Sequence, residues 1–214
     1  YLGYKAVATT TLSPTQINAL SATTPSSPYR YLGGVVHSTP LVVTDSVTLN
    51  SSGNNVGSRK EYVVYGSMEG GLHIVDASTG EEKSVFVPKE VLDNQDGKSL
   101  ANFEFKETGT LSYGVDAPWA ADNTFKVVSS TSNGVTTTKY QATRMNIYGG
   151  LRMGGSALYG LNISSPTSPS LLFQITPSTA GFSRMGQIWS KPTIADIRVK
   201  GERKRVLIFG GGYD

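Results

Sequence analysis

The chain has no cysteine and few charges, and it has no long hydrophobic run. Without cysteine among its 214 residues, disulfides, thiolate zinc sites and a cysteine nucleophile are excluded. The net charge of +3, from 19 basic and 16 acidic residues, is too small to indicate direct nucleic-acid binding. No apolar run approaches the roughly 20 residues of a membrane-spanning helix. The chain starts at Tyr1 without a signal-peptide pattern, so we expect an internal piece of a longer protein.

Glycine is abundant, at 24 residues, and short runs of Val, Ile and Tyr alternate with turn-forming residues. This pattern is typical of an all-β protein. Helix signals are few: Ser13-Pro14 precedes a short helix over Gln16–Leu20, and Pro88–Leu92 predicts one turn. The expected strands are Val35–Val36, Leu41–Thr44, Tyr62–Tyr65, Leu72–Asp76, Ser84–Val87, Lys126–Val128, Lys139–Ala142, Asn146–Tyr148, Ala157–Asn162, Leu171–Ile175, Thr193–Ile197 and Val206–Phe209.

Several of these strands are apolar on both faces, among them Tyr62–Tyr65 and Val206–Phe209. A strand of a two-layer sandwich should instead alternate apolar and polar residues. Strands buried on both sides indicate sheets stacked face to face, as in a β-propeller.

An internal repeat supports the propeller. Pro40, Pro118 and Pro192 lie 78 and 74 residues apart, and each precedes an apolar strand. An aromatic-glycine pair ends a later strand of each repeat, with its glycine at positions 66, 149 and 210. Gly-Gly pairs at 70–71 and 154–155 then introduce a third strand, and an outer strand follows. This order predicts four-stranded antiparallel blades with variable insertions, such as Gly53–Asn55 and Thr131–Thr138.

The repeat divides the chain into about two to three blades of a larger ring, because propellers close with 4–8 blades. The remaining blades of the same protein are expected beyond Asp214. The predicted divisions are a leading segment with the short helix (1–30), a first blade (31–92), a second blade with insertions (93–183) and the start of a third blade (184–214).

The glycine-rich stretch from Gly66 to Gly71 does not match a phosphate-binding loop, because no Lys-Ser/Thr and no helix follow it. We interpret Gly70-Gly71 as a hairpin turn with positive φ, and Asp76 with Gly80 as a second turn. We therefore predict no catalytic, cofactor or metal residues. The positions singled out are structural turn and repeat positions: Pro40, Gly66, Gly70, Gly71, Asp76, Gly80, Pro118, Gly149, Gly154, Gly155, Pro192 and Gly210.

Three other features have structural interpretations. His37 and His73 sit among apolar residues without an acidic or histidine neighbour at ligand spacing, which favours a structural role. A calcium loop that includes the stretch Asp93–Lys98 would need acidic residues at the first and last of its 12 positions. The sequence has no acidic residue at either position, so we expect a polar turn. The basic cluster within Lys200–Arg205 is interpreted as a solvated hairpin turn.

Four stretches resemble the PilC/PilY family of type IV pilus biogenesis proteins and adhesins. They are LGGVVHSTPLVV (Leu32–Val43), YVVYGSMEGGLHIVDASTGEEKSVFVPKEVL (Tyr62–Leu92), YGGLRMGGSALYGLNISSP (Tyr148–Pro166) and Met185–Asp214, which ends in RVLIFGGGYD. The resemblance implies part of a C-terminal β-propeller domain in an exported protein at the bacterial cell surface, on the pilus tip or the outer membrane.

The resemblance also implies a function. The protein would be a non-enzymatic scaffold that assists pilus assembly, opposes retraction, and supports adhesion, twitching motility and DNA uptake. Pilin or minor pilins would be its partners, and the adhesion ligand is unknown. Calcium is implied for an aspartate-rich loop outside this chain, and no calcium ligand transfers to the residues present.

Two alternatives remain open at this stage. The hairpin from Gly66 to Glu82 also resembles repeats of quinone-dependent dehydrogenases and of outer-membrane assembly scaffolds. The dehydrogenases typically carry an adjacent cysteine pair, which this chain lacks. Quinone reduction would favour the first alternative, and mislocalised outer-membrane proteins with normal pili would favour the second.

Overall fold

The computed structural model describes residues 34–93 and 113–212. These residues belong to one compact unit, Gly33–Asp214. The strands are β1 (Leu41–Asn50), β2 (Lys60–Gly66), β3 (Leu72–Asp76), β4 (Glu82–Phe86), β5 (Trp119–Ser132), β6 (Val135–Gly150), β7 (Leu158–Asn162), β8 (Ser170–Ile175), β9 (Thr193–Val199) and β10 (Glu202–Ile208). A short helix, α2 (Lys89–Asp93), follows β4, and a 3-10 turn, η1 (Arg152–Gly154), follows β6.

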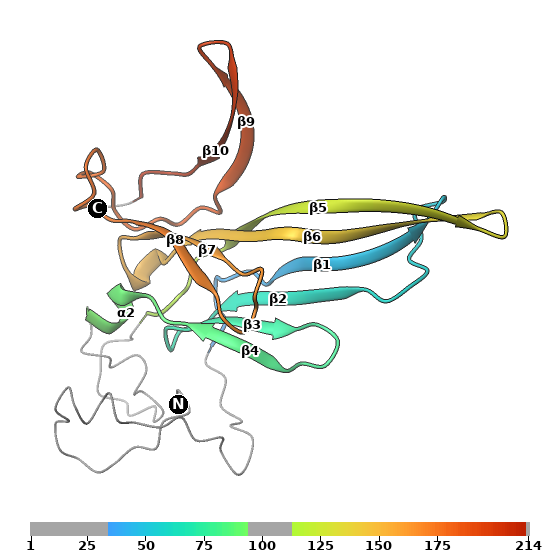
Figure 1. Cartoon of the computed structure of the whole chain (residues 1–214). Helices are drawn as coiled ribbons and strands as arrows, with labels where there is room; N and C mark the ends of the chain where they lie inside the picture. The colour runs from blue at the N-terminus through green and yellow to red at the C-terminus, as the bar shows by residue number, and fades with distance from the viewer. Residues whose placement is uncertain (1–33, 94–112, 213–214) are drawn as a thin grey trace, which may run out of the picture. The chain divides into compact units, whose positions relative to one another are not determined.

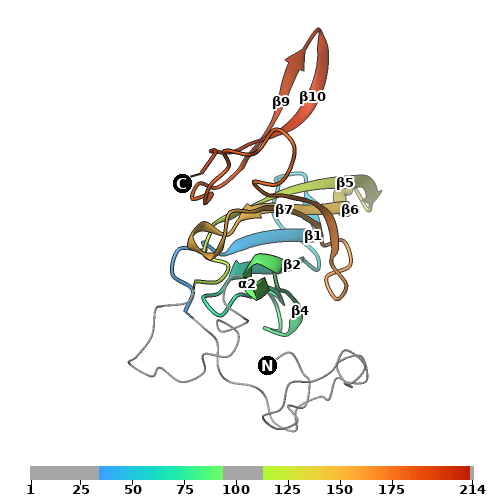
Figure 2. The same ribbon diagram turned by 90° about the vertical axis from the view of Figure 1, so that its left-hand side faces the viewer.

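The predicted all-β fold with four-stranded antiparallel units is confirmed. Strands β1 to β4 pair in sequence order as one antiparallel meander, and β5 to β8 pair as a second. Strands β9 and β10 form a separate antiparallel hairpin. Figure 1 and Figure 2 show the two meanders curling toward each other. This is the arrangement of consecutive propeller blades.

The main core lies between the two meanders. Buried residues of the first meander share one hydrophobic cluster with buried residues of the second, including Trp119 and Tyr159. Phe86 of β4 meets Tyr159 of β7 edge to face, with ring centroids 5.3 Å apart. Fully burying each large side chain contributes about 1.5–3 kcal/mol, so this shared cluster holds the two meanders together.

The second meander is buried on its other face as well. Leu158 of β7 packs with Met185 and Ile188, and partly buried Leu207 and Phe209 join them from the β10 side of the chain. This packing places the β9–β10 segment against the second meander. The expected burial of both faces is not found at Tyr62–Tyr65, where buried and half-buried residues alternate, or at Val206–Phe209, where Ile208 is 53% exposed.

One feature of the sheet differs from separate blades. β1 carries a bulge between Thr44 and Ser46, and beyond it Ser46–Asn50 pairs with Thr137–Gln141 of β6. The two meanders are therefore joined in one eight-stranded sheet. This pairing links residues about 90 positions apart, which no local sequence pattern indicates.

The expected insertion at Thr131–Thr138 is an extension of two strands rather than a loop. β5 and β6 instead continue through this region as a hairpin of 14 and 16 residues, which extends past the other strands in Figure 1. Asn133 (φ 49°) and Gly134 (φ 76°) make its turn. Asn-Gly is the sequence signal for a two-residue hairpin turn, and threonine favours strands, so the pattern was present but not recognised.

The predicted strand at Val35–Val36 is wrong. Both residues lie in irregular backbone with 38% and 59% of their surfaces exposed, and the first strand begins after Pro40. The expected turn at Pro88–Leu92 is present as α2. The predicted helix at Gln16–Leu20 and most of Asp93–Lys98 lie outside the described residues.

Candidate functional site

The three repeat prolines occupy equivalent places in the structure. Pro40, Pro118 and Pro192 each come directly before a strand, β1, β5 and β9 respectively. Two residues before the first proline, Ser38 Oγ accepts a 2.7 Å hydrogen bond from the amide of Gly66. In the third repeat, a Cβ added at Gly210 would lie 3.4 Å from Ser190 Oγ. The proline strand and the glycine strand of a repeat thus approach each other at this end.

Gly66 and Gly149 serve close packing. A Cβ at Gly66 would lie 2.0 Å from the carbonyl oxygen of Val115, and one at Gly149 would lie 2.3 Å from the ring of Trp119. Neither glycine has positive φ. These glycines let neighbouring strands and loops approach where any side chain would collide.

The Gly-Gly pairs differ from the prediction. Gly70 has positive φ (107°), but Gly71 does not. A Cβ at Gly71 would instead lie 2.7 Å from Val85 Cγ1, so crowding requires glycine there. Gly154 is the last residue of η1, and a Cβ added there would collide with the carbonyl oxygen of Gly114. Gly155 has positive φ (153°).

The turn after β3 has the predicted geometry. Asp76 Oδ1 accepts hydrogen bonds from the amides of Ser78 (2.9 Å) and Thr79 (3.2 Å) and from the Ser78 hydroxyl. Gly80 closes the turn at φ 73°. The hydrogen bonds from Ser78, followed by that from Thr79, lower the pKa of Asp76 to about 2. Asp76 is therefore an ionised turn-former.

Both histidines have carboxylate partners that sequence spacing did not reveal. His37 Nδ1 lies 2.8 Å from Asp116 Oδ2, and Arg152 Nη1 donates to the same oxygen at 3.2 Å. Asp116 is 1% exposed and 79 residues from His37, so only the fold brings them together. This cluster around the buried Asp116 fixes the segment before β1 to the loop before β5.

His73 stands between a carboxylate and a hydroxyl. Its Nδ1 lies 2.6 Å from Glu82 Oε2, and its Nε2 lies 3.0 Å from Ser67 Oγ. The order matches that of a hydrolase triad. Ser67 is only 1% exposed, however, and the ring of His73 is stacked on the ring of Tyr65. The hydroxyl is enclosed by its own meander, so the arrangement is structural.

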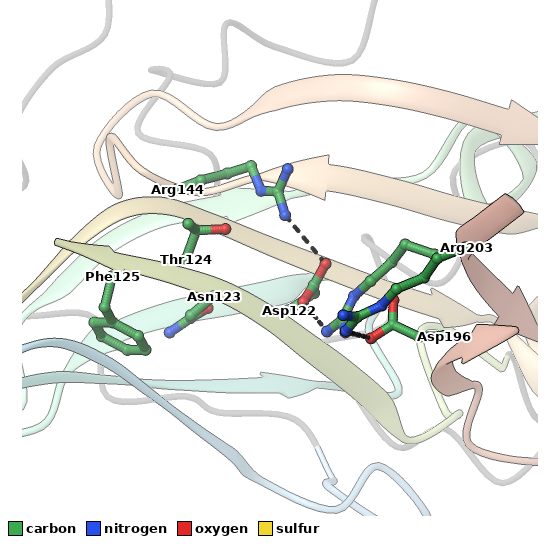
Figure 3. Close-up of a pocket in the computed structure, with 8 residues that line it drawn as sticks. Asp122, Asn123, Thr124, Phe125, Arg144, Asp196 and Arg203 are labelled. Carbon is green, nitrogen blue, oxygen red and sulfur yellow. Dashed lines mark hydrogen bonds and ion pairs between the residues drawn. The ribbon is translucent and has the colours of Figure 1, made fainter.

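Charged and polar side chains line a groove beside β5. The groove has a volume of about 540 Å³, within the usual range for ligand pockets. We call it the Asp122 groove. Figure 3 shows its lining: Asp122, Asn123, Thr124, Phe125, Arg144, Asp196, Arg203 and Arg205.

Asp122 organises one side of the groove. Its side chain is 7% exposed, and its two oxygens accept from Arg205 Nη2 at 2.5 Å and Arg144 Nη2 at 3.3 Å. Asp196 of β9 accepts from Arg203 at 2.7 Å and from Arg205 at 3.1 Å. The bond from Arg203 is the main cause of the lowered pKa of Asp196. One guanidinium, that of Arg205, thus bridges two carboxylates on different sheets.

The interpretation of the basic cluster as a hairpin turn is confirmed at Lys200 and Gly201, whose φ angles are 52° and 87°. It is incomplete for Arg203 and Arg205, because their side chains enter the ion-pair network of the Asp122 groove. The partner of Arg205 lies 83 residues away, which sequence spacing could not show.

Two searches of the described residues complete the description. Within residues 34–93 and 113–212, no group of three or more His, Asp or Glu side chains is placed to hold a metal ion. Among the helices in this part of the chain, none is long and apolar enough to cross a membrane.

A comparison with known proteins returns a type IV pilus biogenesis factor. The chain is 27% identical over 196 residues to the Type IV pilus biogenesis factor PilY1 of Pseudomonas aeruginosa (strain UCBPP-PA14). This match covers 85% of the chain but only 15% of that protein. This match supports the resemblance to the PilC/PilY family that the motifs indicated.

A structural comparison returns the crystal structure of the Pseudomonas aeruginosa PilY1 C-terminal domain. The TM-score is 0.43 at 24% identity, over 73% of this chain and 25% of that one. No protein-family profile matches the chain.

Proposed function

We propose that this chain is part of a type IV pilus biogenesis factor and acts as a non-enzymatic scaffold at the cell surface. The observation that carries the proposal is the match to PilY1 along 85% of the chain, in a protein whose name states that role. The repeat residues that carry the family resemblance, such as Gly66 and Gly149, serve packing in the structure, which suits a scaffold.

The finer role follows the family resemblance. The protein would support pilus extension against retraction and act at the pilus tip or outer membrane as an adhesin. Twitching motility and DNA uptake would depend on it through the pilus. Pilin or minor pilins would be the partners, and calcium would bind outside the described residues.

The packing of the fold suits a load-bearing scaffold. The two meanders share a core and are also joined by the pairing of β1 with β6, so separating them requires breaking both. A rigid body of this kind can present loops and edges as one composite surface.

One face of the β9–β10 hairpin suits further blades. Ile197, Val199 and Ile208 lie on one side of the hairpin and are 39%, 37% and 53% exposed. An apolar strand face of this kind is normally covered in a stacked-sheet fold. We propose that another blade of the same protein covers it.

The direct test is deletion of the gene in the bacterium that encodes the chain, followed by counting surface pili by electron microscopy. We expect pili and twitching to be lost and both to return with the wild-type gene. Normal pili with mislocalised outer-membrane proteins would point to an envelope assembly scaffold. Quinone reduction by the purified protein after cofactor reconstitution would point to the dehydrogenase alternative.

A further inference from the structure

We propose that the Asp122 groove binds an acidic saccharide, a sugar ring that carries a carboxylate. This binding role does not depend on the proposed function in pilus biogenesis.

The groove has more hydrogen-bond donors than its carboxylates use. Three guanidinium groups, from Arg144, Arg203 and Arg205, face two carboxylates, from Asp122 and Asp196. Each guanidinium has five N–H donors, and the ion pairs of the groove occupy one or two of them on each arginine. Arg144 and Arg203 are 48% and 78% exposed, so their free donors are open to a ligand. Paired N–H groups on a planar fork match a carboxylate.

The aspartates hold these guanidiniums in place before a ligand arrives. Arg144 is anchored by the buried Asp122, and Arg203 is anchored by Asp196. Because Arg205 contacts both aspartates, the two anchors are fixed relative to each other. Ordering long side chains in advance reduces the entropy lost on binding.

An acceptor for sugar hydroxyls lies beside the donors. Both hydrogen bonds to Asp196 end on Oδ2, which leaves Oδ1 for a ligand donor. The Asn123 amide donates to the carbonyl of Thr44, but its Oδ1 is buried without a partner among the described residues. Because the Asn123 oxygen is enclosed by the fold, Asp196 Oδ1 is the acceptor that the groove offers to a ligand.

The lining also offers an apolar surface and a third kind of polar group. Phe125 lines the groove and is held edge to face against Tyr140, with centroids 6.5 Å apart. An aromatic ring gives the C–H face of a sugar an apolar contact, and Thr124 adds a hydroxyl. A bare inorganic anion would use the arginines alone, whereas an acidic sugar ring would also use Asp196 Oδ1 and the Thr124 hydroxyl.

The test is isothermal titration calorimetry on the full chain with three probes: D-glucuronate, D-glucose and acetate. We expect glucuronate to bind and the other two to bind at least about tenfold more weakly. Glucose lacks the carboxylate, and acetate lacks the sugar ring with its hydroxyls. Acetate binding as tight as glucuronate would reduce the groove to a bare anion site and overturn the proposal. Glucose binding as tight, or no binding of glucuronate, would also overturn it.

Variants connect the binding to the groove. Arg144→Gln and Arg203→Gln each remove charge-assisted donors, and each should weaken glucuronate binding about tenfold. Lys204→Gln is the matched control, because Lys204 lies between Arg203 and Arg205 but points to the other face of the hairpin, opposite Ile197. Its affinity should stay within about twofold. Equal affinities for all three variants, each folded by circular dichroism, would contradict the proposal. Arg203→Gln alone decides the matter if Arg144→Gln does not fold.

Discussion

Arg205 on β10 donates from Nη2 to Oδ1 of Asp122 on β5 at 2.5 Å, across 83 residues of chain. This ion pair joins the β9–β10 hairpin of the third repeat to β5, the first strand of the second meander. Asp122 is 7% exposed while Arg205 is half exposed, so the carboxylate is the buried partner of this pair.

Asp122→Asn should lower the free energy of unfolding by about 2 kcal/mol, because two arginines lose a buried anionic partner. Chemical denaturation followed by circular dichroism measures this change. Asp196→Asn is the matched control: it also contacts two arginines but is 27% exposed, so its loss of stability should be clearly smaller. Equal losses in the two variants would contradict the distinction between the buried and the exposed carboxylate.

Gly66→Ala should destabilise the protein by about 3 kcal/mol, since the added methyl would collide with the Val115 carbonyl in a packed interior. Gly211→Ala serves as the control, because no atom lies within 4 Å of its added Cβ and its φ is not positive. Its stability should change by less than about 0.5 kcal/mol. A tolerated Gly66→Ala would show that the first repeat is not packed as described.

Asp76 should make stability depend on acid pH. Its pKa falls from an ordinary 3.8 to about 2 in the folded protein, chiefly through the hydrogen bonds from Ser78. Its contribution is therefore complete above about pH 4 and is lost as the pH falls through 2. We expect Asp76→Ala to lower the melting temperature at pH 7, and the difference from wild type to shrink toward pH 2. A difference independent of pH would show that the ionised carboxylate does not hold the turn.

The sequence predicted the parts of the fold that local patterns encode. Leu72–Asp76 is a strand with the predicted bounds, and the turn at Asp76 and Gly80 follows from side-chain and glycine chemistry. The predicted burial of both strand faces holds for Leu72–Ile74 but not for Val206–Phe209, where Ile208 is 53% exposed. The joining of β1 to β6 was not predictable in this way, because their pairing depends on where two distant strands extend past their blades.

The polar sites depended still more on tertiary structure. His37 with Asp116 and Arg205 with Asp122 are separated by 79 and 83 residues, so neither pairing has a spacing signal. Gly71 was correctly identified as a required glycine, but for the wrong reason, since crowding by Val85 rather than positive φ excludes a side chain. By contrast, the Asn133-Gly134 turn was readable, and recognising it would have predicted the long β5–β6 hairpin.

The proposed support of pilus extension against retraction is tested most directly by one measurement. Surface pili are counted by electron microscopy in the gene deletion strain, with the retraction motor either intact or inactivated. We predict few pili when the motor is intact and restored pili when it is inactivated, with the wild-type gene restoring pili in both backgrounds. Wild-type numbers of pili in the deletion strain with an intact motor would contradict the account.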